Sequence, residues 1–173
     1  MPEEALAVPQ LEHFGSIGGD FELTDHHGRP FRLSDHKGQV VLLFFGFTFC
    51  PDVCPTTMAK VAQAYDQLGE GSAEVLPLFV SLDPGRDTPQ VLAEYLQYFG
   101  IGALGLTGSE TEIRRVTEQY GSHFSVEETD SAGGYTIDHS TFIFLIDQEG
   151  VIRYLFRHSD KPQVMAAVIA QLL

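Results

Sequence analysis

Residues 40–57 read VVLLFFGFTFCPDVCPTT, an apolar run that leads into the only two cysteines of the sequence, Cys50 and Cys54. The run 40–45 has the composition of a central strand that is covered on both faces. Pro55 suits the first turn of a helix, because its missing N–H would have no intrahelical partner there. The stretch therefore predicts a buried strand, a cysteine loop and a helix, with a site at the carboxyl end of the strand.

The flanking sequence predicts the other elements of an α/β sheet. Apolar and polar residues alternate in 21–24 and 31–33 across a turn-forming segment, which predicts an N-terminal β-hairpin. A second buried strand is predicted at 75–81 and a C-terminal hairpin at 141–146 and 151–156. Proline or capping signals predict helix starts at Pro55, Thr88, Ser109 (with Glu112) and Pro162. We expect a thioredoxin-like fold with an added N-terminal β-hairpin and an extra helix.

Length and charge limit the organisation and the partners. A chain of 173 residues, 43% of them hydrophobic, suits one domain, which we place at 13–173 after a flexible N-terminal arm at 1–12. The formal net charge of −14 opposes binding to nucleic acid and to anionic lipid. No apolar run approaches the ~20 residues that span a bilayer, and the first residues lack the features of a secretory signal. We therefore expect a soluble domain.

Cys50 and Cys54 lie within reach of one metal ion or one disulfide bond. Reduced copper prefers thiolates, often completed by an imidazole, so the histidines matter. His139 stands out among the seven, because residues 135–141 directly precede a predicted strand, and in a thioredoxin-like fold that loop abuts the cysteine loop. The other six are expected to be ordinary polar side chains: His13, His26, His27, His36, His123 and His158. Thioredoxin-type oxidoreductases carry a proline in this loop, and the sequence has none between Gly121 and Lys161.

Four motifs occur in a fixed order: GFTFCPDVCPTT at 46–57, SLDPGRDT at 81–88, LTG at 106–108 and YTIDHS at 135–140. With these motifs the sequence resembles the Sco/SenC family of copper-binding assembly factors for cytochrome c oxidase, from about Phe14 to the C-terminus. The resemblance implies a thioredoxin-like fold and copper ligands at Cys50, Cys54 and His139. Two thiolates and a neutral imidazole suit Cu(I), whereas Cu(II) would need a further ligand.

The resemblance also implies a partner and a location. Family members deliver copper to the dinuclear copper centre of cytochrome c oxidase subunit II, with another copper carrier as a possible donor. They usually hang from the membrane on an N-terminal helix, on the periplasmic side in bacteria, and we find no such anchor in this sequence. Asp52, between the cysteines, and Asp138, beside His139, are candidates for supporting the ligands rather than for binding copper. A turn-stabilising role is the alternative for Asp52.

Other functions remain open at this point. The strongest is a thiol-disulfide oxidoreductase that reduces the acceptor's copper-binding cysteines, with Cys50 attacking and Cys54 resolving, and it is compatible with copper transfer. A peroxiredoxin-like peroxidase is disfavoured, because Phe47 and Pro51 occupy the positions three residues before the cysteines where a threonine is usual. A purely structural disulfide would close too short a loop to stabilise the fold much. Zinc is conceivable in a site with an open position. The principal expectation is a copper-binding protein that is not an enzyme.

Overall fold

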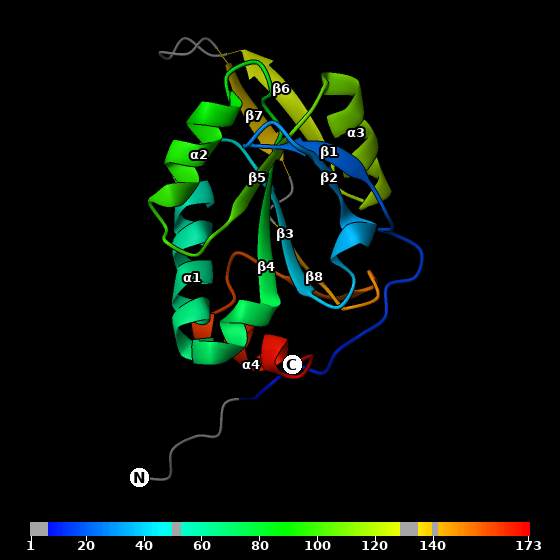
Figure 1. Ribbon diagram of the computed structural model, residues 1–173, viewed down its shortest axis with the longest axis vertical. Coiled ribbons are helices and arrows are strands. Elements are labelled where there is room, and N and C mark those ends of the chain that lie inside the picture. Colours follow the sequence, from blue (N-terminus) through cyan, green and yellow to red (C-terminus); the bar gives the residue numbers. More distant parts are fainter. Residues whose placement is uncertain (1–6, 50–52, 129–134, 140–141) are drawn as a thin grey trace.

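The computed structural model describes residues 7–49, 53–128, 135–139 and 142–173, and in this part the chain folds around a seven-stranded sheet (Figure 1). The strand order is β2-β1-β5-β4-β3-β8-β9. The central strands β3, β4 and β5 are parallel, and the strands on either side of them pair antiparallel. The strands of this sheet are β1 (Glu22–Asp25), β2 (Pro30–Arg32), β3 (Val40–Gly46), β4 (Val75–Ser81), β5 (Leu104–Thr107), β8 (Ile143–Ile146) and β9 (Ile152–Phe156).

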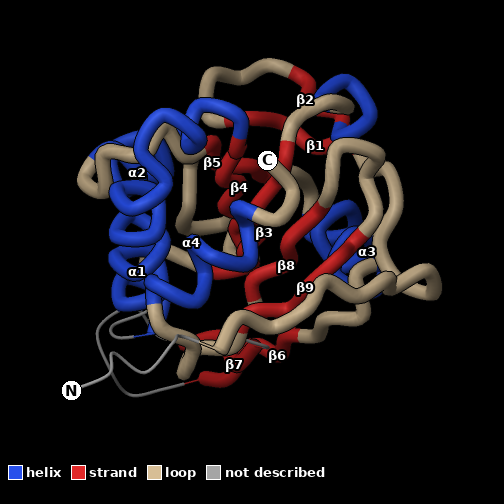
Figure 2. The backbone as a smooth tube through the Cα atoms, turned by 90° about the horizontal axis from the view of Figure 1, so that it is seen from below, coloured by secondary structure: helices blue, strands red, loops and turns tan. Residues whose placement is uncertain are grey.

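Helices cover both faces of this sheet. Helices α1, α2 and α4 lie on one side and α3 lies on the other, as Figure 2 shows. The described helices are α1 (Val53–Leu68), α2 (Pro89–Gln97), α3 (Glu110–Gln119) and α4 (Pro162–Ala170), with 3-10 turns η1 (Leu33–His36) and η2 (Gly69–Glu74). This arrangement confirms the predicted α/β class.

The central strand β3 is buried along its whole length, as predicted. Side chains alternate between the two faces of a strand. Leu42 and Phe44 therefore join the core beneath α1 and α4, whereas Leu43 and Phe45 join the core beneath α3. The strand is thus held in one register by two hydrophobic cores, and its carboxyl end leads directly to the predicted site.

The predicted helix starts are confirmed, and side-chain caps explain those of α2 and α3. Thr88 accepts a hydrogen bond from the N–H of Val91 at the start of α2. Ser109 and Glu112 form the expected capping box on α3. Pro55 lies in the first turn of α1, as its missing N–H requires.

Residues near the N-terminus lie along the last strand. The N–H of Glu12 donates to the carbonyl of Arg153 at 2.7 Å, and Phe14 forms an isolated bridge with Ile152. Leu11 packs against the core. The division into an arm at 1–12 and a domain at 13–173 stays a prediction.

The prediction of a loop before the C-terminal hairpin is partly wrong. Residues Tyr135–His139 form strand β7, which pairs antiparallel with β6 (Phe124–Glu128) in a separate two-stranded sheet. Strand β7 forms because Ile137 is buried in the core beneath α3 while the ladder with β6 satisfies the backbone. Strand β5 was also not assigned from the sequence, and β8 begins at Ile143.

Among the described helices, none is long and apolar enough to cross a membrane.

Candidate metal centre

Cys54 is the predicted ligand whose side chain the structure describes, and it is fully buried. It lies in the first turn of α1, where backbone N–H groups without intrahelical acceptors favour a negatively charged ligand. Its Sγ atom packs against Gly46 at the end of β3: a Cβ atom on Gly46 would lie 3.0 Å from this sulfur. The same Cβ would lie 2.8 Å from Phe44 Cε1 and 3.1 Å from Phe79 Cε2. The glycine therefore opens the space that the thiol occupies.

Thr57 lies one helical turn after Cys54 and is also buried. Among the described residues its hydroxyl finds no hydrogen-bond partner. Residues three apart on a helix are neighbours, so a polar group lies beside the thiol on α1. Soft sulfur, the helix N-terminus and the glycine cradle together fit a cation that prefers thiolate.

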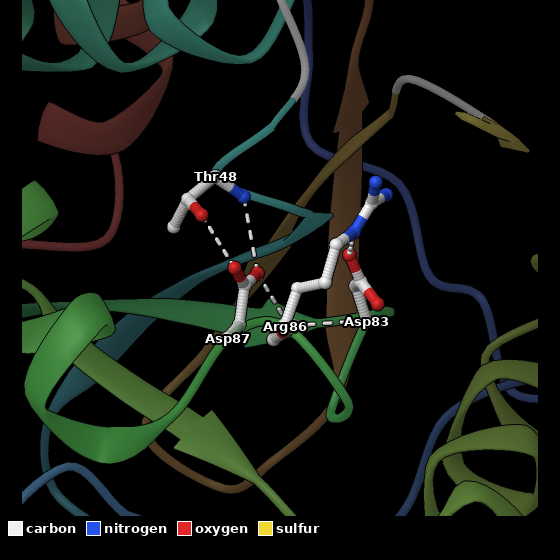
Figure 3. A network of polar contacts seen from close by, with 5 residues as sticks. Thr48, Asp83, Arg86 and Asp87 are labelled. Atoms are coloured by element: carbon white, nitrogen blue, oxygen red, sulfur yellow. Dashed lines mark hydrogen bonds and ion pairs between the residues drawn. The ribbon is translucent and has the colours of Figure 1, made fainter. Parts of the chain in front are cut away.

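The two residues before Cys50 are held by the loop that follows β4. The backbone N–H of Thr48 donates to Asp87 Oδ2 at 3.0 Å, and the Thr48 hydroxyl donates to Asp87 Oδ1 (Figure 3). Phe49 is half exposed, and the Arg86 guanidinium lies 4.4 Å from the centre of its ring. Asp83 accepts a hydrogen bond from Arg86 Nε and thereby fixes the guanidinium.

Asp87 is completely buried, and Ser81 Oγ also donates to its Oδ2 at 2.7 Å. Burial raises the pKa of Asp87, while the hydrogen bonds from Thr48 and Ser81 oppose that rise. Asp83, Arg86 and Asp87 thus shape this loop through their side chains, and Thr88 caps α2.

His139 is the last residue of β7, opposite Phe124 in the β6–β7 ladder. The chain rejoins the main sheet at Ile143, which pairs with Phe44 of β3. Four residues extend at most ~14 Å, so the backbone of His139 stays near the carboxyl half of β3. Figure 1 shows the β6–β7 hairpin at the end of the molecule where α1 begins. The topology thus places His139 at the same end of the sheet as Cys54.

The rest of the predicted set lies outside what the structure describes. Cys50 and Asp52 lie outside the described residues, and the side chains of Asp138 and His139 are likewise not described. Within the described part of the chain, no group of three or more histidine, cysteine, aspartate or glutamate side chains could hold a metal ion. The ligand set therefore stays a prediction.

The side chains of two other histidines, His26 and His36, make contacts that support the fold. His26 Nδ1 accepts the N–H of Gly105 at 3.0 Å, and burial, together with the neighbouring His27, lowers the pKa of His26. His36 stacks on Phe31, with ring centres 4.7 Å apart, at the end of η1. The imidazole of each one fixes a turn near the N-terminal hairpin.

Residues 10–173 match the model of the SCO1/SenC family. The chain belongs to the SCO1/SenC family. It is 40% identical over 168 residues to a SCO2-like protein of Rickettsia felis, a match that covers 95% of this chain and 82% of that relative. The family therefore accounts for nearly the whole chain, and the four sequence motifs identified it correctly.

Solved structures agree with the family assignment. ScoI of Bradyrhizobium japonicum with copper bound superposes with a TM-score of 0.83 at 36% identity, over 91% of this chain and 99% of that one. BsSco, in which a disulfide switch was identified, gives a TM-score of 0.70 at 21% identity, over 92% of this chain and 98% of that one, and this likeness bears on the fold alone. The thioredoxin-like fold of this SCO1/SenC protein is thereby confirmed.

Sequence reasoning missed the contacts of Thr48 and Ser81 with Asp87. The motif SLDPGRDT does signal a polar loop, because it places two carboxylates after a buried strand. Nothing in the sequence connects that motif to Thr48, because 39 residues separate Thr48 from Asp87.

Proposed function

We propose that this SCO1/SenC protein binds copper through Cys50, Cys54 and His139 and delivers it to the dinuclear copper centre of cytochrome c oxidase subunit II. The observation that carries the proposal is the position of Cys54, with a buried thiol in the first turn of α1 and a glycine opposite its sulfur. Cys50 precedes Cys54 by four residues in the sequence, and the pairing of β7 with β6 supports a position of the His139 backbone at this end of the sheet.

Two thiolates and one imidazole give a three-coordinate site that suits Cu(I), and Cu(II) would take a further ligand. The low coordination number leaves room for an incoming thiolate from the acceptor. Copper can then pass by ligand exchange, in which a new thiolate adds before an old one leaves. Asp52 and Asp138 are proposed to support the ligands rather than to bind the metal. A second copper carrier is the proposed donor, and the proposed location is the periplasmic side of the bacterial inner membrane.

The burial of Cys54 also favours one order of events in the alternative function, reduction of the acceptor's cysteines. A fully buried thiol is a poor attacking group for a protein disulfide, so Cys50 would attack and Cys54 would resolve. The two thiols would lose two electrons and two protons and form the Cys50–Cys54 disulfide, while the acceptor disulfide would gain both and become a dithiol.

The decisive experiment is an anaerobic Cu(I) titration of the wild-type protein and of Cys50→Ser, Cys54→Ser and His139→Ala. We expect one copper ion per wild-type chain, with two sulfur ligands and one nitrogen ligand in X-ray absorption. Each variant should bind copper much more weakly. His158→Ala, which removes an exposed imidazole, is the matched control and should bind like the wild type.

The same variants separate the two functions. His139→Ala should lose stable copper binding but keep the ability of its dithiol to form a disulfide. Copper binding at wild-type strength in His139→Ala would refute the ligand set. Rapid reduction of the acceptor's disulfide by copper-free protein would establish the reductase function instead.

A further inference from the structure

The loop between β4 and α2 contacts both residues that precede Cys50. Asp87 holds Thr48 through the backbone N–H and through the hydroxyl. Arg86 lies over the exposed ring of Phe49. Figure 3 shows Asp87 facing Thr48 while Arg86 turns to Asp83. Two neighbouring side chains of one loop thus hold two consecutive residues of the segment that leads to Cys50.

This loop is itself fixed to the sheet. Ser81, at the end of β4, donates its hydroxyl to Asp87, and the N–H of Asp87 donates to the carbonyl of Asp83 at 2.8 Å. The N–H of Leu82 donates to the carbonyl of Gly46 at 2.8 Å, which ties the loop to the end of β3. Gly46 is also the residue against which the Cys54 sulfur packs. The adjoining ends of β3 and β4 therefore contact both Cys54 and the segment before Cys50.

From these contacts we infer that Asp87, with Arg86, is a positioning residue for Cys50. The inference rests on the proposed copper function and deepens it. The Cα atom of Cys50 lies one peptide, 3.8 Å, beyond that of Phe49, so fixing Thr48 and Phe49 restricts where the Cys50 thiolate can lie. Metal sites require their ligands to be held within ~0.5 Å of the productive geometry.

The chemistry of the contact supports this role over simple stabilisation of the loop. A carboxylate is costly to bury, and a neutral acceptor would suffice for a single hydrogen bond within the loop. Asp87 instead accepts bonds from two hydroxyls and a backbone N–H at once, which fixes the direction of the chain at Thr48. Such supporting contacts around metal ligands typically change metal affinity ~10- to 100-fold when they are removed.

The test compares Asp87→Asn and Thr48→Val with the wild-type protein. Asp87→Asn keeps the shape but replaces one acceptor oxygen with a donor. Thr48→Val keeps the backbone bond and removes the hydroxyl. Thr117→Val is the matched control, because it removes a buried hydroxyl that donates to the carbonyl of Ile113 within α3.

We expect the Cu(I) dissociation constant, from competition with a chromogenic chelator, to rise ~10- to 100-fold in Asp87→Asn. In Thr48→Val, which loses one hydrogen bond, it should rise about fivefold. Thr48→Ser should restore the wild-type constant. Thr117→Val should lower the melting temperature as Thr48→Val does but bind copper like the wild type.

A second measurement, on copper-free protein, keeps this inference separate from the copper function. The equilibrium of the Cys50–Cys54 dithiol with glutathione also depends on the position of Cys50. It should change about tenfold in Asp87→Asn, which for this two-electron couple is about 30 mV. If wild-type protein fails to bind copper, the proposed function is wrong, and this equilibrium still decides the role of Asp87. Folded Asp87→Asn and Thr48→Val with wild-type values in both measurements would overturn the inference.

Discussion

Replacement of Gly46 with alanine tests whether the end of β3 holds the Cys54 thiol. The added Cβ would lie 3.0 Å from Cys54 Sγ, about 0.4 Å closer than the 3.4 Å at which ordinary contact begins. It would also lie 2.8 Å from Phe44 Cε1 and 3.1 Å from Phe79 Cε2, and both rings belong to the packed core. The sulfur, a ring or the strand must therefore move. Overpacking of this kind costs ~1–3 kcal/mol of folding free energy.

The displacement is close to the ~0.5 Å tolerance of a designed metal site, so copper affinity should fall as well. We expect the Cu(I) dissociation constant of Gly46→Ala to rise about tenfold, equivalent to ~1.4 kcal/mol. Chelator competition gives this constant, and urea denaturation of the copper-free protein gives the stability loss.

Gly105→Ala in β5 is the matched control. Its added Cβ would lie 3.1 Å from Leu92 Cβ, 3.1 Å from Leu96 Cδ1 and 3.3 Å from His26 Nδ1, which is similar crowding away from the cysteines. We expect a comparable loss of stability with unchanged copper affinity. The reasoning fails if Gly46→Ala binds copper like the wild type, or if Gly105→Ala weakens copper binding equally.

Three further predictions concern the scaffold. Ser109→Ala should cost ~1 kcal/mol in urea denaturation, because it removes the side-chain cap of α3, and an unchanged midpoint would contradict the capping box. The hydrogen bonds from Ser109 lower the pKa of Glu112. The ionised carboxylate therefore stabilises the fold fully at a pH above its ordinary pKa, and this contribution is lost as the pH falls through the lowered pKa. The stability difference between wild type and Glu112→Gln should thus be present at neutral pH and vanish in acid, once the pH is below the lowered pKa; a pH-independent difference would argue against the linkage. Tyr65→Phe should lose ~1–2 kcal/mol, since the buried Tyr65 hydroxyl donates to the carbonyl of Val75 at 2.6 Å, and thermal denaturation that matches wild type would show that this bond adds nothing.

The elements that the sequence predicted are those with local signals. An unbroken apolar run predicted β3, and the run at Val75–Ser81 predicted β4 with the observed bounds. The Ser109–Glu112 pattern predicted the start of α3 because the cap bonds join residues three apart. Pro55 placed Cys54 at the start of a helix. In each case, the physical cause lies within one turn or one strand of the residues that signal it.

The elements that the sequence reasoning missed depend on distant partners. Strand β5 is four residues long, and its backbone is paired by β4 on one side and by β1 on the other. The segment at Tyr135–His139 carries some alternation, but it is a strand because β6 pairs with it and because Ile137 is buried. Short apolar segments of this kind do not distinguish strand from loop before their partners are known. The contacts of Asp87 with Thr48 were missed for the same reason, because the two residues are distant in the sequence.

The proposed ligands differ in how firmly their backbones are held. Cys54 is part of a 16-residue helix whose inner face packs on the main sheet, and its sulfur contacts the end of the buried strand β3. His139 belongs to a two-stranded ladder, which is at best marginally stable alone, so the ladder depends on contacts such as the burial of Ile137. The main core therefore holds the backbone of Cys54, whereas the backbone of His139 depends on the two-stranded ladder and the burial of Ile137. This difference explains why a local motif predicted the place of Cys54 at the start of a helix, whereas the backbone conformation at His139 had to come from the tertiary structure.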